Sequence, residues 1–331
     1  MKKIWFVIAA LLATNVMAKE NVFEIPAEHM PVKMLAHNKE TLVVTTQSVS
    51  RLVKGKPEVI VAAGGITDAV VTGNELWLAT YKGVQKYELG KKAILKQTYF
   101  HDVRIAALAL DTYHRLWVAT SFKGVFMQQA DSFEKKVNIP GAYSLACTPD
   151  SNIWVGTNVG LYRIAANDFS TTRYAEEGYS GYELPDNLVE RLYADDASNV
   201  WVVMPDNISF KSNKKYQGEL PSYAYVGDKN NELKKIVTLK GSSYLFITQK
   251  GMYFLPSTSL KEEHHHGGSE IFSGDDAQAF AINGKHVSMP SKLANAAVQY
   301  AERVGNDLYF VTEKGGWKIK EKDFIKQITR K

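Results

Sequence analysis

The sequence Asn152-Ile-Trp-Val-Gly-Thr-Asn-Val-Gly-Leu-Tyr-Arg-Ile164 carries the pattern on which the fold of this chain depends. Aromatic and β-branched residues alternate as far as Thr157, an Asn interrupts them, and a second run begins after Gly160. This pattern predicts two short antiparallel strands joined by a tight turn. Because one hairpin is not stable alone, the fold depends on how often the pattern recurs.

The same pattern occurs seven times along the chain. Four of the six Trp residues occupy the same position in the first run of their copy, and the spacings between these four are 40, 37 and 47 residues. Each repeat therefore has room for about four short strands, which is typical of a β-propeller blade. The four residues are Trp77, Trp117, Trp154 and Trp201. The seven copies begin near Thr41, Leu76, Leu116, Asn152, Val200, Tyr244 and Leu308.

We therefore predict an all-β fold, a seven-bladed propeller of four-stranded antiparallel blades with each Trp packed between adjacent blades. One domain is expected over residues 19–331, with an irregular insertion at about 257–295. Within that segment Asn283-Gly284 predicts a hairpin turn, so an eighth blade is the alternative. Residues 323–329 are expected to form the last outer strand, with the first blade complete by itself.

The repeat resembles that of the two-component regulator propeller family, in which Asp-x-x-Gly/Asn-x-Leu-Trp-x-Gly-Thr-x-x-Gly-Leu marks each blade. The resemblance covers residues 65–210 well and the remainder only by its rhythm. It implies a propeller of the kind that commonly forms the extracytoplasmic sensing part of membrane histidine kinases. The matching residues are Asp150 to Leu161, with weaker matches at Asp111 to Val125, Asp196 to Ile208 and Asn74 to Val84.

The N-terminus has the pattern of a secretory signal peptide. Lys2 and Lys3 precede an apolar run of about a dozen residues, and Val16-Met-Ala18 provides a cleavage site. We predict removal of residues 1–18 and a periplasmic or secreted protein with no membrane span in the mature chain. An N-terminal membrane anchor is the alternative, although the run is short for a span.

Loss of the two lysines lowers the formal net charge from +5 to +3, which does not indicate nucleic-acid binding. Cys147 is the single cysteine, so no disulfide forms within the chain, and this fits a periplasmic location. Because Cys147 lies in an inner-strand pattern, we expect a buried, unreactive thiol.

The turns between the second and third strands are expected to share one face with the links between blades. Aromatic side chains from Tyr81 and Phe122, and from Tyr179 and Tyr182 in a long link, would add apolar surface to this face, which Arg104 would extend. Such a face suits a small anionic or carbohydrate-like ligand, or an acidic patch of a partner protein. The alternative is that lysine is merely a soluble residue in these turns, where glycine supplies positive φ. Lysine precedes glycine in four of the turns, at Lys82, Lys123, Lys250 and Lys314.

Three consecutive histidines, His264, His265 and His266, form the other unusual feature. Imidazoles bind Zn or Cu, so this loop is a candidate metal site, although three consecutive side chains cannot all converge on one ion. An exposed polar loop is the alternative. No other cofactor is expected.

Motifs for catalysis are absent from the sequence, which contains no Gly-x-Ser-x-Gly, His-Glu-x-x-His or phosphate-binding loop. The recurring aspartates Asp111, Asp150 and Asp196 are expected to cap turns. These patterns favour an exported, non-enzymatic binding or interaction protein, a ligand-sensing or adaptor propeller that works with a membrane or periplasmic partner. A periplasmic metal-handling protein that uses the histidine loop is one alternative. A propeller-type lyase or hydrolase with its site at the central mouth is another.

Overall fold

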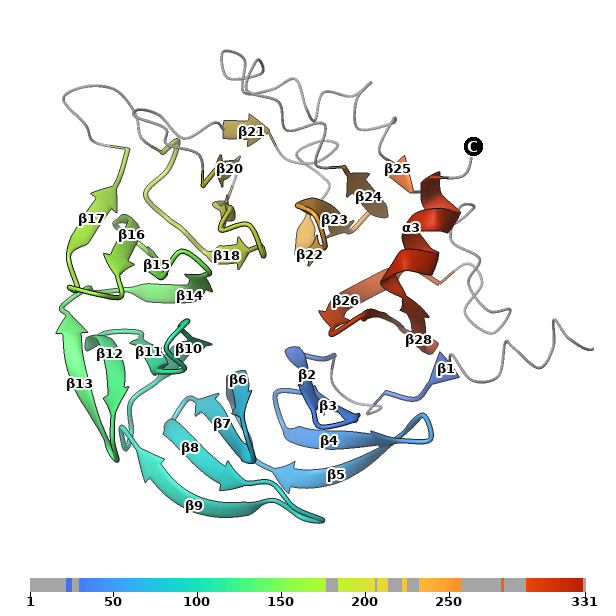
Figure 1. Ribbon diagram of the computed structural model, residues 1–331, viewed down its shortest axis with the longest axis horizontal. Coiled ribbons are helices and arrows are strands. Elements are labelled where there is room, and N and C mark those ends of the chain that lie inside the picture. The colour runs from blue at the N-terminus through green and yellow to red at the C-terminus, as the bar shows by residue number, and fades with distance from the viewer. Residues whose placement is uncertain are drawn as a thin grey trace, which may run out of the picture.

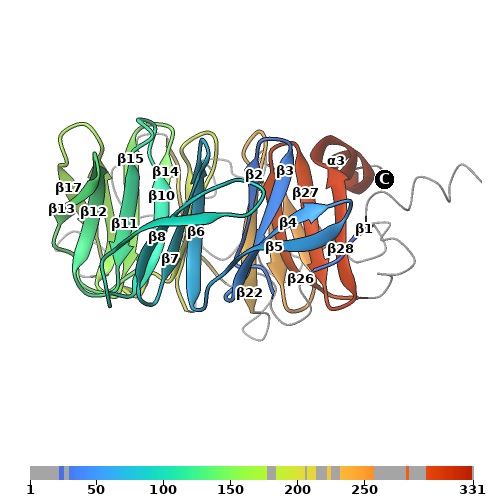
Figure 2. The same cartoon turned by 90° about the horizontal axis from the view of Figure 1, so that it is seen from below.

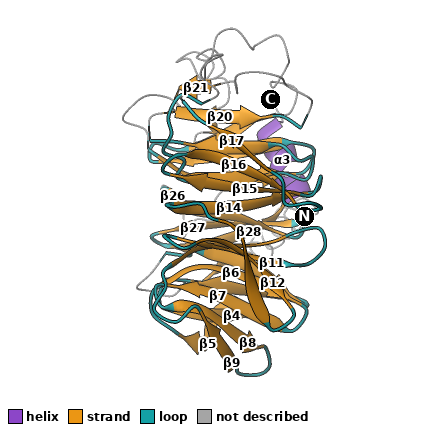
Figure 3. Ribbon diagram, turned by 90° about the vertical axis from the view of Figure 1, so that its left-hand side faces the viewer, coloured by secondary structure: helices purple, strands orange, loops and turns teal. Residues whose placement is uncertain are grey.

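The computed structural model describes residues 22–25, 30–176, 184–205, 207–213, 222–224, 232–256, 281–282 and 296–329. Seven four-stranded antiparallel sheets are arranged around a central axis (Figure 1), which confirms the seven-bladed propeller. Viewed from the side, the ring is a flat disc whose strands run between its two faces (Figure 2, Figure 3).

Each blade except the last follows the chain from its inner strand to its outer strand, and blades 1 to 7 are numbered along the chain. The inner strands are β2 (Lys33–His37), β6 (Ile66–Thr72), β10 (Ile105–Leu110), β14 (Ala142–Thr148), β18 (Arg191–Ala194), β22 (Leu233–Leu239) and β26 (Val298–Val304). The second strands are β3 (Glu40–Val44), β7 (Glu75–Thr80), β11 (Leu116–Thr120), β15 (Asn152–Thr157), β19 (Val200–Val203), β23 (Ser243–Thr248) and β27 (Asp307–Thr312). The third strands are β4 (Ser48–Val53), β8 (Gly83–Glu88), β12 (Gly124–Gln129), β16 (Gly160–Ala165), β20 (Asn207–Lys211), β24 (Met252–Leu255) and β28 (Gly315–Lys320). The outer strands are β5 (Lys56–Ala62), β9 (Ile94–Tyr99), β13 (Ser132–Val137), β17 (Thr171–Tyr174), β21 (Ser222–Ala224), β25 (Ala281–Ile282) and β1 (Val22–Phe23).

The repeated tryptophans pack between neighbouring blades, as predicted. Trp117 in blade 3 is fully buried and lies in one apolar cluster with Ile153 and Val155 of blade 4. A buried indole of this kind removes about 150–250 Å² of surface from water. The tryptophans therefore hold together sheets that share no strand pairing. The equivalent contacts join Trp77 to blade 3, Trp154 to blade 5 and Trp201 to blade 6.

A threonine at the end of the second strand fixes the turn that follows it in six blades, a role that sequence reasoning missed. The Thr80 hydroxyl donates to the carbonyl of Gly83 at 2.8 Å and accepts from the backbone N–H of Lys82 at 3.1 Å. Gly83 has a φ of 131°, and a Cβ there would lie 2.3 Å from the carbonyl oxygen of Tyr99. Threonine and glycine therefore set the conformation of the turn, which does not depend on the side chain of the lysine between them. The other five threonines are Thr45, Thr120, Thr157, Thr248 and Thr312.

Buried aspartates cap turns at the opposite ends of the strands. The Asp111 carboxylate accepts from the backbone N–H groups of Tyr113 and Arg115, both at 2.9 Å. It also accepts from Arg115 Nε at 2.7 Å and Trp117 Nε1 at 2.8 Å. Burial would raise the pKa of Asp111, but these hydrogen bonds outweigh burial and hold the pKa below its ordinary value.

In blade 5 the capping residue is Asp195 rather than the expected Asp196. Asp195 directly follows its inner strand, as Asp111 does, and accepts from the backbone N–H groups of Ala197 and Asn199. Asp196 instead pairs with Arg303 at 2.9 Å. The expectation was one residue out because the two acidic residues are adjacent in sequence.

The ring closes through the N-terminal segment, which the sequence reasoning did not anticipate. β1 pairs antiparallel with β28, with Val22 opposite Trp317 and Phe23 opposite Gly316, so β1 is the outer strand of blade 7. The Phe23 ring covers Gly316, where a Cβ would lie 2.1 Å from the ring, and it contacts Tyr309 edge-on at 5.6 Å. Blade 1 is complete by itself, as expected.

Residues 323–329 were expected to be the last outer strand, and this expectation is wrong. They belong to helix α3 (Glu321–Thr329), which packs Phe324 and Ile328 against the core of blades 6 and 7. Residues 324, 325 and 328 are apolar, a helical spacing that places them on one face. The Glu321 carboxylate accepts from the backbone N–H of Lys240 at 2.6 Å, which anchors the first turn.

The outer strand of blade 6 comes from the segment that was expected to be an insertion. β25 pairs with β24 and lies inside the segment 257–295 that the sequence assigned to an insertion. The rest of that segment, including Asn283-Gly284, lies outside the described residues, as do residues 1–18 of the predicted signal peptide. Apart from α3, each element of the described chain is a strand.

Candidate functional site

One face of the ring carries both the turns between second and third strands and the links between blades, as predicted. Backbone hydrogen bonds join the two kinds of segment directly. The Asp102 N–H donates to the Lys82 carbonyl at 3.2 Å, and the Ser121 N–H donates to the Arg104 carbonyl at 3.1 Å. We call this surface the link face. In blades 1 to 4 it includes the turns 45–48, 81–82, 121–123 and 158–159 and the links 63–65, 100–104 and 138–141.

Five of the predicted residues gather on the link face of blades 2 and 3. The Arg104 guanidinium lies 4.9 Å from the centroid of the Tyr81 ring, a cation–π distance, and Tyr81 is 54% exposed. Phe122 follows Ser121, whose backbone N–H donates to the Arg104 carbonyl, and the Phe122 side chain is 83% exposed. Both lysines of these turns are also exposed. We call this cluster the Phe122 patch, and it consists of Tyr81, Lys82, Arg104, Phe122 and Lys123.

The remaining predicted residues lie elsewhere. Lys250 and Lys314 are exposed on the link face of blades 6 and 7, so the four lysines form two pairs on different parts of the ring. Tyr179, Tyr182 and His264 to His266 lie outside the described residues, and their roles stay predictions. Where the structure describes the chain, no cluster of three His, Cys, Asp or Glu side chains is placed to hold a metal ion.

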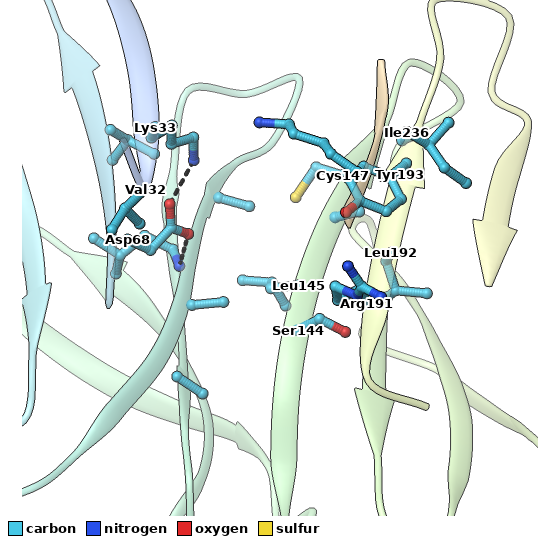
Figure 4. Close-up of a pocket in the computed structure, with 18 of the residues that line it drawn as sticks. Val32, Lys33, Asp68, Ser144, Leu145, Cys147, Arg191, Leu192, Tyr193 and Ile236 are labelled. Atoms are coloured by element: carbon cyan, nitrogen blue, oxygen red, sulfur yellow. Dashed lines mark hydrogen bonds and ion pairs between the residues drawn. The ribbon is translucent and has the colours of Figure 1, made fainter. Parts of the chain in front are cut away.

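A second feature, which the sequence did not reveal, lies on the axis of the ring. The inner strands enclose a cavity of about 530 Å³, shown in Figure 4. The wall formed by β10 and β14 is mostly small and apolar, whereas the other inner strands contribute charge. The charged lining residues are Lys33, Asp68, Glu190, Arg191, Lys235, Glu302 and Arg303. The available signal was the occurrence of these residues inside otherwise apolar strand patterns.

Most of the charged lining groups form an ion pair with a group from another blade. Arg191 also bonds to another blade, but its guanidinium donates to the backbone carbonyls of Leu233 and Lys234, both at 2.8 Å, and not to a carboxylate. It has no ion pair with a carboxylate among the described residues. The pairs are Lys33 with Asp68 at 2.7 Å, Lys235 with Glu302 at 2.5 Å and Arg303 with Asp196 at 2.9 Å.

Burial keeps the weakly acidic groups of the cavity protonated. It raises the pKa of the Cys147 thiol, and the charge of Asp111 acts in the same direction. It also raises the pKa of the lining residue Tyr193. The Ser144 hydroxyl has no hydrogen-bond partner in the described structure. Ser144 therefore has no bonded base among the described residues, and none of the described lining residues is histidine.

Comparisons with known proteins identify the fold. No protein-family model matches the chain, and no curated protein matches it. The extracellular domain of a putative hybrid two-component system protein from B. thetaiotaomicron is similar in structure, with a TM-score of 0.63, 16% identity and 90% of this chain covered. The chain has the fold of that domain. This chain spans 39% of the length of that solved extracellular domain.

Two further similar structures belong to proteins with different roles. Virginiamycin B lyase from Staphylococcus aureus, solved with quinupristin, has a TM-score of 0.61 at 12% identity, with 90% of this chain and 97% of the lyase covered. PorZ, a surface component of the type-IX secretion system of Porphyromonas gingivalis, has a TM-score of 0.61 at 14% identity, with 90% and 47% covered. At these identities the likeness establishes the fold and not the activity. No helix among the described residues is long and apolar enough to span a membrane.

Proposed function

We propose that the chain is an exported binding protein whose partner contacts the Phe122 patch. The observation that carries this proposal is the 83% exposure of Phe122 at the tip of a turn. Covering a phenylalanine ring is worth about 1.5–3 kcal/mol, so a ring held in water is a ready contact for a partner. Aromatic and arginine side chains are also enriched among the residues that dominate binding energies.

The charge of the patch favours an acidic partner surface. Lys82 and Lys123 directly follow Tyr81 and Phe122 in their turns, Arg104 contacts the Tyr81 ring, and all three cations are exposed. Charges at the rim of an interface mainly select partners and accelerate encounter, while the aromatic centre supplies affinity. The partner is therefore expected to be an anionic surface with an apolar centre, presented by a membrane-bound or periplasmic protein. Two of the similar structures are an extracellular domain and a bacterial surface component, and these locations support an exported role.

Photo-crosslinking tests the proposal in cells that express the protein. A photoreactive phenylalanine analogue replaces Phe122 in one variant and Tyr113 in the control. Tyr113 is a close match, because it is 57% exposed and has the Arg115 guanidinium 4.7 Å from its ring centroid, yet it lies in a turn on the opposite face. We expect one discrete crosslinked species from position 122 and none from position 113.

Charge reversal provides the second arm of the experiment. Arg104→Glu is expected to reduce the crosslink from position 122 by about tenfold, since it places a carboxylate opposite the anionic partner. Phe122→Ala should change the free energy of unfolding by less than about 0.5 kcal/mol, because the side chain is exposed. Equal crosslinking from both positions, or none from position 122, would contradict the proposal.

A further inference from the structure

The inner strands of the propeller are joined near the axis by polar side chains at several blade boundaries. The bonds join blade 1 to 2, 2 to 3, 5 to 6 and 6 to 7. No such bond joins β14 to either neighbouring inner strand where the structure describes these strands. Blade 4 therefore contributes to the cavity a wall that packs against its neighbours through apolar side chains and makes no polar bond to their inner strands.

This wall is mostly apolar, and the Ser144 hydroxyl on it lies against Gly156 of β15. Figure 4 shows Ser144, Leu145 and Cys147 along β14, with Arg191 on the adjacent inner strand. The Ser144 hydroxyl is buried without a hydrogen-bond partner. Tyr143 lies at the link-face end of the same wall, in a bulge of β14 opposite β15, and is half exposed. The wall is therefore reachable from the link face.

Arg191 supplies a positive charge that the described structure does not balance. Each terminal nitrogen of its guanidinium makes one bond to a carbonyl, the Tyr193 hydroxyl lies close enough to interact with the guanidinium, and Nε has no partner. Each terminal nitrogen carries a second N–H, so donors remain for another acceptor. The other cations that line the cavity have carboxylate partners. Glu190, the neighbouring residue, is exposed and has no ion pair with Arg191 among the described contacts.

We propose that the cavity binds a small organic anion, with its carboxylate on Arg191 and its apolar part against β14 and β10. Charge-assisted hydrogen bonds from a guanidinium are among the strongest that a carboxylate makes. A cavity of about 530 Å³ lies within the usual range for small-ligand sites, about 300–1,000 Å³. This site is separate from the Phe122 patch, and the inference does not depend on the proposed function.

Ligand-observed fluorine NMR tests the site with two matched probes, 4-fluorobenzoate and the neutral 4-fluorobenzamide. We expect the benzoate to bind more tightly than the benzamide. Arg191→Gln should weaken benzoate binding about tenfold or more and leave the benzamide unchanged, because only the charged acceptor uses the guanidinium. Arg191→Lys should retain part of the preference, since the charge remains. Tyr113→Ala, on the face opposite the link face and outside the cavity, serves as the control and should change neither titration.

Substitution of Arg191 could disturb folding, since Arg191 also bridges blades 5 and 6. A second variant that leaves Arg191 in place therefore tests the same cavity. Ala106→Leu fills space from the β10 wall without touching the charge, and should weaken both probes together. Equal affinity for benzoate and benzamide would overturn the proposal. Absence of binding by the benzoate, or benzoate binding that neither substitution changes, would overturn it as well.

Discussion

Replacement of Asp111 by alanine is the most direct test of how the repeated turn stabilises the propeller. The carboxylate is almost fully buried and receives four hydrogen bonds, from two backbone N–H groups, Arg115 Nε and Trp117 Nε1. Alanine removes the acceptor for all four. The backbone donors can turn toward water, but Trp117 is fully buried and cannot.

The magnitude follows from the two groups left without partners. An indole N–H buried without an acceptor costs about 1–3 kcal/mol, and loss of the charged partner of the partly buried Arg115 adds about 1–2 kcal/mol. We therefore expect Asp111→Ala to lower the free energy of unfolding by about 2–5 kcal/mol. With an unfolding entropy of about 2.1 cal/mol/K per residue, this corresponds to a decrease in Tm of about 3–7 °C.

Differential scanning calorimetry measures the change, with Asp196→Ala as the matched control. Asp196 is also an aspartate of a repeat turn and pairs with Arg303, but its side chain is 67% exposed, so its loss should cost at most about 1 kcal/mol. If Asp111→Ala lowers the Tm no more than Asp196→Ala does, the buried carboxylate does not stabilise the turn as reasoned here.

Three other outcomes are expected. Gly83→Ala should lower the free energy of unfolding by about 2 kcal/mol or more, measured by urea denaturation, because its Cβ would meet the Tyr99 carbonyl; Gly73→Ala, with open space around it, should cost about 1 kcal/mol. The stability advantage of the native protein over Asp111→Asn should be full above pH 4 and shrink as the pH falls through the lowered pKa of Asp111, and an advantage that persists at low pH would contradict this. Cys147 should react with a small thiol reagent at pH 8 at least about a hundredfold more slowly than free cysteine, because burial raises the pKa of its thiol; a rate near that of free cysteine would refute this.

The blades were predictable because their signal is repeated and local. Trp77 and its equivalents mark the second strand, and glycine at positions such as 83 marks the turn, so seven copies reinforce one another. Ring closure was not predictable in the same way, since β1 has two residues and no periodicity. The one available signal was Gly316, which stands where other blades have an apolar residue and leaves room for the ring of Phe23.

The candidate sites were predictable only in part. Topology alone placed the turns and links on one face, because alternate ends of antiparallel strands must lie together. The contact of Arg104 with Tyr81 depends on side-chain directions that spacing does not give. The axial cavity was missed because residues such as Arg191 come from strands that are distant in sequence, and their shared lining exists only after the ring has formed.

Closure through β1 also constrains how the chain reaches its folded state. Val22 pairs with Trp317, 295 positions later in the chain. Closing so long a loop costs entropy before the contact is made. The ring can therefore close only after blade 7 has formed, and β28 has an unpaired edge until β1 pairs with it. Such an edge accepts strands from other molecules as readily as its own. A crowded population of newly made chains thus has a route to exchanging N-terminal segments, which would link rings into dimers whose blades are all individually correct.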